Sequence, residues 1–113
     1  MSIEQQLATT LSALVGGRIY PLTAPDSPVT PYIVYHNIAN TPENTLADGV
    51  PINNTRMQVD CYDKTYAAVK TLAASVIASM AAAAFTNIAT LNQDIYEAEV
   101  KLFRVQQDFS IWY

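Results

Sequence analysis

The last thirteen residues of the chain, 101–113, alternate with a period of two. Large apolar and polar side chains occupy opposite faces: Phe103, Val105, Phe109, Ile111 and Tyr113 against Arg104, Gln106, Asp108 and Ser110. Residues 56–62 repeat this pattern, with Met57, Val59 and Cys61 facing one way and Arg56, Gln58 and Asp60 the other. A period of two is typical of a strand with one buried face. The chain must therefore build a sheet and cover one of its faces.

A helix is predicted over residues 2–15. Ser2 followed by Gln5 is a capping-box pattern, which satisfies backbone N–H groups at the start of a helix. Apolar residues then recur at helical spacing: Ile3, Leu7, Leu11 and Leu14. Gly16 and Gly17 end the helix, because glycine reaches the left-handed conformation at little cost.

A short extended piece, residues 18–20, leads into a segment with four prolines, which excludes helix. Residues 32–38 are β-branched and aromatic and predict a strand; apolar residues on both faces of its first half suggest that both sides are covered. Residues 40–54 are polar and contain prolines, and predict a long loop of the kind that is usually functional or mobile. An antiparallel hairpin would join this strand to the one at 56–62.

A second helix is expected from Asp63, as its N-cap, to about Ala83. Its apolar stripe comprises Tyr66, Val69, Leu72, Ala73, Val76, Ile77 and Met80. Its many alanines allow close packing against a sheet. A further strand is predicted around residues 88–96. This order of elements predicts a single α+β domain over residues 1–113, mainly an antiparallel β-sheet with two helices packed on one face.

Composition narrows the classes of function. Half of the 113 residues are hydrophobic and the formal net charge is −4. A core-forming, acidic chain without a basic cluster is not expected to hold nucleic acid. The one cysteine excludes an intramolecular disulfide. No signal peptide follows Met1 and no apolar stretch is long enough to span a bilayer, so the simplest interpretation is an intracellular soluble protein.

Few residues suggest reaction chemistry. His36 and Cys61 would be a conceivable nucleophilic pair, but Cys61 alternates with buried positions, as a structural cysteine does. Glu97 and Glu99 share a strand face, which more often is a solvated face than an acid pair. Metal-ligand spacings and glycine-rich phosphate loops are missing from the sequence. No catalytic residue, cofactor or metal is therefore predicted, and an enzyme is not expected.

Residue types that favour contacts between proteins are more prominent than residues that suggest catalysis. The chain has seven tyrosines, and tyrosine and tryptophan are enriched at protein interfaces. Trp112 and Tyr113 at the end of the last strand fit an interface and the core of the sheet about equally well. Together with the 40–54 loop they give a predicted assembly interface, which comprises Thr41, Glu43, Asn44, Asp48, Asn53, Trp112 and Tyr113.

Ordered landmarks cover nearly the whole chain. They are RIYPL at 18–22, PYIVY at 31–35, RMQVDCY at 56–62, Tyr96, and LFRVQQDFSIW at 102–112. Together these blocks resemble the tail completion (tail-to-head joining) family of long-tailed bacteriophages and prophages. Ile19, the centre of the third block and Gln107 depart mildly from the family's commoner residues.

The resemblance implies a subunit with the architecture of phage tail terminators. Such subunits form a ring, commonly of six, between the tail tube protein and the head–tail connector proteins. DNA passes through the ring without specific binding, and a weakly acidic lumen suits this passage. The protein would be found in the host cytoplasm during assembly and then in the virion tail, with no membrane partner. The resemblance supplies no catalytic residues.

A mechanism follows as a hypothesis: the 40–54 loop orders only on assembly, which delays ring formation until a completed tail is present. Two other classes of function stay open. One is a monomeric prophage-encoded adaptor that binds a host protein. The other, less favoured, is an enzyme that uses His36 and Cys61.

Overall fold

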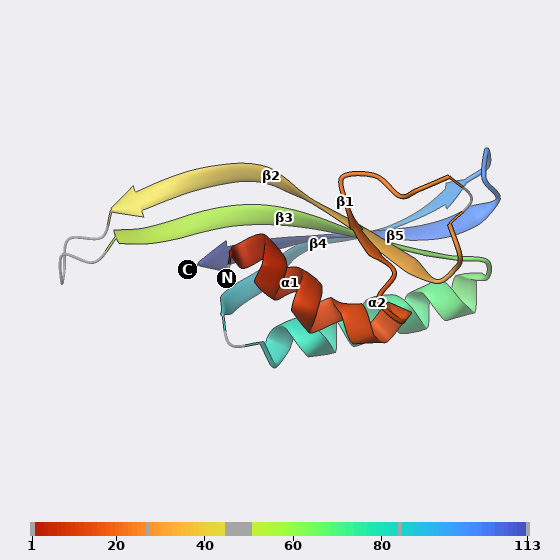
Figure 1. The fold of residues 1–113 in the computed structure, drawn as a ribbon, viewed down its shortest axis with the longest axis horizontal. Helices are drawn as coiled ribbons and strands as arrows, with labels where there is room; N and C mark the ends of the chain where they lie inside the picture. The colour runs from red at the N-terminus through yellow and green to blue at the C-terminus, as the bar shows by residue number, and fades with distance from the viewer. Residues whose placement is uncertain (1, 27, 45–50, 84, 113) are drawn as a thin grey trace.

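A five-stranded sheet covered by two helices forms the molecule (Figure 1). The computed structural model describes residues 2–26, 28–44, 51–83 and 85–112. The elements in chain order are α1 Ile3–Ser12, a 3₁₀ turn Ala13–Val15, β1 Ile19–Pro21, β2 Tyr32–Asn44, β3 Pro51–Asp63, α2 Tyr66–Ala81, β4 Thr86–Glu97 and β5 Leu102–Trp112. The α+β class, the two helices and the mostly antiparallel sheet confirm the predicted fold.

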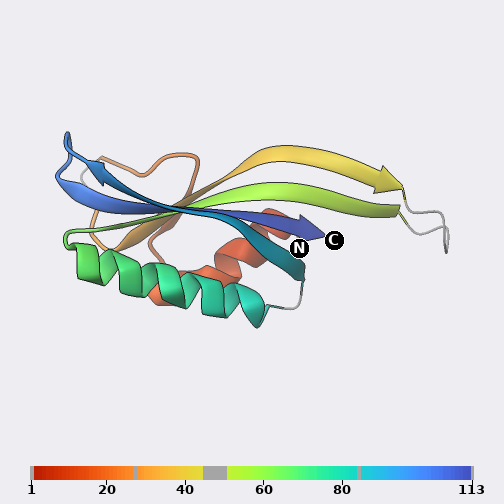
Figure 2. The same ribbon diagram turned by 180° about the vertical axis from the view of Figure 1, so that it is seen from behind.

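The strands lie in the order β1-β2-β3-β5-β4. The short strand β1 runs parallel to β2, and the other three pairings are antiparallel. Both helices lie against the same face of the sheet, and Figure 2 shows this arrangement from behind. The opposite face is called the open face below. Described residues of the segment that joins β1 to β2 lie over part of it, beside Tyr32 and Tyr62.

The core fills the space between the helices and the sheet. The alternation predicted for β3 and β5 is confirmed, because Met57, Val59, Val105, Phe109 and Ile111 are all buried. The helices contribute Leu7, Leu11, Val69, Val76 and Met80 from the other side. Full burial of such a side chain contributes roughly 1.5–3 kcal/mol, so this layer stabilises the fold.

The N-terminal helix follows its prediction. The Ser2 hydroxyl accepts a hydrogen bond from the Gln5 backbone N–H, and the Gln5 side chain accepts one from Ser2 N–H at 3.0 Å. Gly16 and Gly17 have φ angles of 58° and 83°, in the left-handed region that favours glycine. The chain can therefore leave the helix sharply and enter β1.

Two predictions for α2 were wrong: the residue that caps its N-terminus and the width of its apolar stripe. Thr65, not Asp63, is the N-cap, and its hydroxyl accepts from Ala68 N–H at 3.2 Å. Asp63 is still in β3 and its carboxylate accepts from the next backbone N–H, so the chain needs two more residues to turn. Tyr66 and Ile77 are half exposed, because the alanine-rich helix buries a narrower stripe than expected.

The predicted loop at 40–54 is wrong where the structure describes it. Residues 40–44 continue β2 and residues 51–54 open β3, in an antiparallel ladder; residues 45–50 lie outside the described part. Pro42 is tolerated because no strand of the described residues pairs with the outer side of β2 here, and an edge strand accepts proline. The polar, proline-containing composition misled the prediction, because it shows no apolar alternation by which a strand is recognised. The hypothesis that this segment orders only on assembly stays a prediction, now for a strand pair in place of a loop.

Candidate functional site: surfaces for assembly

The β2–β3 hairpin extends beyond the rest of the sheet. The last residue of β5, Trp112, lies opposite Asn54, and Thr86 at the start of β4 lies opposite Trp112. Past this level, residues 42–44 pair only with residues 51–53. Figure 1 shows this extension, here called the arm, projecting away from the helices. It helps to give the molecule its extents of 50 × 24 × 23 Å.

An isolated two-stranded ribbon is at best marginally stable in water. Among the described residues, the arm joins the rest of the molecule at its base, where the end of β5 and side chains around it support β3. One of these supports is Asn54, whose side-chain amide donates to Ser110 Oγ at 2.9 Å and to the Ile111 carbonyl at 3.3 Å. Both backbone edges of the arm lack a further strand among the described residues. Its geometry therefore suits it to contact another molecule.

Five of the seven predicted interface residues fall in described strands. Thr41, Glu43 and Asn44 belong to β2, Asn53 to β3 and Trp112 to β5. The register places Trp112 level with Thr41, with Asn54 of β3 between them. The structure thus brings the C-terminal aromatic residue to the base of the arm. The other two predicted residues, Asp48 and Tyr113, lie outside the described residues.

Trp112 is not part of the helix-covered core. Its neighbour Ile111 is fully buried on the helix side, so alternation along β5 places Trp112 on the open face. It is partly exposed there. The sequence left open whether Trp112 belongs to an interface or to the core of the sheet. The register favours a position that a partner can contact.

A charged network crosses the open face at the other end of the sheet. The Arg104 guanidinium donates to Glu97 Oε1 at 2.8 Å and to Gln106 Oε1 at 3.1 Å. Its Nε lies 3.2 Å from Asp60 Oδ1, as an ion pair whose geometry is not that of a hydrogen bond. Gln58 donates to the other Asp60 oxygen at 2.9 Å. Burial works to lower the pKa of Arg104, but the Glu97 hydrogen bond and the Asp60 charge outweigh it and raise that pKa.

Three tyrosines continue this network toward β1. The rings of Tyr32 and Tyr62 stack at 4.7 Å, and Tyr20 lies 6.3 Å from Tyr32. The Arg104 guanidinium carbon lies 5.9 Å from the Tyr62 ring centre. Burial raises the pKa of Tyr62 to about 12, so this phenol keeps its proton at neutral pH. These side chains hold charges and rings in place and offer no group poised for proton transfer.

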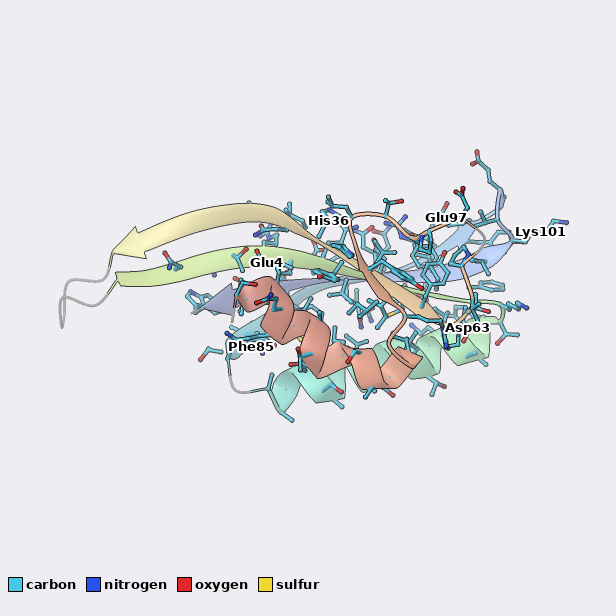
Figure 3. All side chains as sticks on the ribbon, viewed as in Figure 1. Glu4, His36, Asp63, Phe85, Glu97 and Lys101 are labelled. Carbon is cyan, nitrogen blue, oxygen red and sulfur yellow. The ribbon has the colours of Figure 1, made fainter. Side chains whose placement is uncertain are left out.

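A pocket of about 430 Å³ opens beside the tyrosines. Its lining includes Tyr32 and Tyr62, residues of the segment that joins β1 to β2, and Glu97 and Glu99. Glu97 is already bonded to Arg104, so the two glutamates do not form a free acid pair. Figure 3 shows Glu97 on the side of the sheet away from the helices, near the β4–β5 turn that Lys101 marks.

His36 and Cys61 do not form a catalytic pair. Cys61 lies opposite Ile33 on the helix-covered face, whereas His36 lies opposite Gln58 on the open face (Figure 3). The sheet separates them. Burial, followed by the charge of Asp60, raises the pKa of the Cys61 thiol to about 12. The thiol instead contacts Gln107 Oε1 at 3.9 Å, inside the core.

This burial predicts that Cys61 is nearly unreactive in the folded protein. At pH 8 a thiol with a pKa of about 12 is ionised about once in 10⁴, against about one quarter for a free cysteine. Labelling with a chromogenic disulfide should be at least about 100-fold slower than in urea. Because the folded thiol holds its proton more tightly, stability should also fall as pH rises from about 8.5 toward 12. Equal labelling rates in both states would contradict the buried position.

Neither a metal-ion cluster nor a membrane-spanning helix is present among the described residues. They contain no group of three or more histidine, cysteine, aspartate or glutamate side chains that could hold a metal ion. None of the helices in the described part of the chain is long and apolar enough to cross a membrane.

Asp60 and Gln107 are buried polar residues that the sequence analysis did not single out. Asp60 is 4% exposed although its strand face is open, because Arg104 and the tyrosines cover it. Gln107 occupies a core position of β5 and donates to the Ala73 carbonyl of α2 at 3.1 Å. A signal for Gln107 existed, since it falls on the same alternation as Val105 and Phe109. Asp60 had no comparable local signal.

These features define a class of protein: a small α+β assembly subunit with open sheet edges and a projecting arm. The family model described as tail completion protein gp17 matches residues 2–113, and the chain therefore belongs to the tail completion family. This confirms the resemblance drawn from the ordered sequence blocks. The protein is a non-enzymatic structural component of bacteriophage tail assembly and works through contacts with other virion proteins.

Solved structures show the same fold. A chain from the virion of a native gene transfer agent particle matches with a TM-score of 0.64 and 17% identity, over 98% of this chain and 90% of that chain. At this identity the likeness concerns the fold alone. A comparison with curated protein sequences finds no match.

Proposed function

We propose that this protein completes the phage tail by forming a ring, of six subunits, at the upper end of the tail tube. The ring joins the tail tube protein to the head–tail connector proteins, and DNA passes through its centre. Assembly takes place in the host cytoplasm, and the ring then stays at the head–tail interface of the virion.

The arm is the observation that carries this proposal. It extends past every other strand, and its strands pair only with each other among the described residues. Because such a ribbon gains stability from a third strand or a packed surface, a neighbouring subunit is a suitable support. A contact in which one patch meets a different patch repeats around an axis and closes into a ring. The similar chain from a gene transfer agent virion supports a role within a particle.

The acidic net charge of the chain is compatible with the passage of DNA through the centre of the ring. The chain has six lysine and arginine residues against ten aspartate and glutamate residues. Arg104, one of the six, is engaged by carboxylates on the open face. Phosphate binding needs clustered basic groups, so a ring of such subunits would let DNA slide without holding it.

Electron microscopy of particles made without this protein tests the proposal. We expect DNA-filled heads and separate tails, and restoration of joined particles when the native chain is supplied. Mass measurement of the protein on restored tails should give six copies at the upper tail end. Normally joined particles without the protein would contradict the joining role, and a single copy per tail would favour a monomeric adaptor.

A further inference from the structure

The outer edge of β4 lacks the usual protection of an edge strand. Its first eight residues, Thr86–Gln93, carry no charge and no proline. Ile88 and Leu91 are 57% and 40% exposed. Natural edge strands are usually blunted by charges, prolines or bulges, because an open edge is a template for another strand. Here only a bulge at Thr90 interrupts an otherwise open edge.

The opposite side of the same sheet has a second open edge. β1 pairs with β2 only at Ile33–Tyr35. From His36 to Asn44, the outer edge of β2 has no partner strand among the described residues. The molecule thus carries two different open edges, one on each side of its sheet.

The two edges have compatible directions. Successive antiparallel pairings along β2, β3, β5 and β4 make β4 run opposite to β2. In a cyclic ring whose strands run along the axis, the neighbour's β2 has the same axial direction as this subunit's β2. It therefore runs antiparallel to β4, which is the pairing that exchanges perpendicular hydrogen bonds.

The edges also lie at matching levels of the sheet. The register places Leu91 level with His36 and Ile88 level with Ala39. Thr86 is level with Thr41, so Pro42, which cannot donate a backbone hydrogen bond, falls just outside the matched stretch. The bulges of β2 and β4 lie in adjacent rungs, and the local twist that each imparts falls at the same height.

We propose that the β4 edge of each subunit pairs with the β2 edge of a second copy of this chain, at Thr86–Leu91 and His36–Thr41. This inference rests on the proposed ring and names the surface that closes it. The pairing joins the subunit sheets into one continuous wall and leaves neither edge exposed in the assembled ring. It also places the arm, which continues β2, against the neighbouring subunit.

Cysteine cross-linking on assembled tails tests the pairing. The paired substitutions Ala39→Cys with Ile88→Cys, and His36→Cys with Leu91→Cys, are introduced into the full chain and incorporated into particles. Within one chain each pair is three strand spacings apart, about 14 Å, too far for a disulfide. Mild oxidation should therefore give a ladder of linked subunits up to the closed ring on a non-reducing gel.

Three controls make the result specific. Ala39→Cys with Gln93→Cys keeps the same face but shifts the level by four residues, about 13 Å, and should not cross-link. Each single-cysteine chain should stay monomeric on the gel. Thermal unfolding of each variant before assembly should match the native chain, because Ile88, Leu91 and Ala39 are exposed.

The outcomes separate this inference from the proposed function. Copies present as a ring on joined tails, without a cross-link from either matched pair, would overturn the strand pairing and leave the ring intact. Dimers from Ile88→Cys alone would show β4–β4 pairing instead and would also overturn it, as would equal cross-linking of the shifted pair. Single copies on tails would reject the ring itself.

Discussion

The variant Arg104→Met should unfold with a free energy about 3 kcal/mol lower than that of the native chain. The reason is Asp60, which is 4% exposed and faces the Arg104 guanidinium at 3.2 Å. Without that charge, the Asp60 carboxylate keeps the Gln58 amide as its one side-chain partner among the described residues. Breaking a buried ion pair by removing one partner typically costs about 3–5 kcal/mol; the lower end applies because Arg104 is 20% exposed. Urea denaturation followed by circular dichroism measures the change.

A matched control separates charge loss from shape. Arg56→Met removes the same side chain from an exposed position on the same face and should change stability by less than about 0.5 kcal/mol. Asp60→Asn in the Arg104→Met background should recover about half of the loss, because the uncompensated charge is gone. Equal effects of Arg104→Met and Arg56→Met would show that Asp60 does not depend on the ion pair.

Much of the fold could be predicted because local patterns and burial agree. The alternation in β3 and β5 reports directly which side chains meet the helices, and Met57, Val59, Val105 and Phe109 are buried as that pattern indicates. The capping box at Ser2 is also local, since it depends on two side chains three residues apart. Such local features can be predicted because the tertiary packing agrees with them.

Features that depend on distant contacts could not be predicted. Residues 40–44 and 51–54 form strands because each segment supplies the other with backbone partners, which a polar, proline-containing sequence does not indicate. Asp60 is buried by Arg104, 44 positions later in the sequence. The N-cap at Thr65 was missed because the end of β3, and not the choice of residue, decides where α2 begins.

The candidate interface was predicted only in outline. Thr41 and Trp112 were chosen for polar loop character and for a terminal aromatic residue, yet the register places them at one level of the same sheet. The β4 edge was not predicted. Its uncharged sequence indicates a strand, but does not show that this strand lies at the edge of the sheet. Whether a strand lies at an edge is a property of topology, which local sequence does not specify.

The second large effect is expected from Phe109→Ala, which should lower the free energy of unfolding by about 4 kcal/mol. Phe109 is 1% exposed and is the largest fully buried side chain in the described core, in the cluster between the sheet and the helices. Its removal loses buried apolar area and leaves a cavity, and Phe→Ala changes of this kind cost about 3–5 kcal/mol. A domain of this size has a total stability of about 5–15 kcal/mol, so the midpoint of thermal unfolding should fall by about 15–20 °C.

Ile88→Ala is the matched control, because Ile88 is 57% exposed and lies on the proposed pairing edge. It should leave the unfolding midpoint within about 2 °C of the native value, while reducing ring formation on tails. Phe109→Ala should lower the unfolding midpoint, but should not reduce ring formation once the count is corrected for the amount of folded protein, since Phe109 is a core residue of the inner strand β5. Calorimetry on the free chains and counts of joined particles measure the two effects. A loss below about 1.5 kcal/mol for Phe109→Ala would contradict the packed core described for this residue.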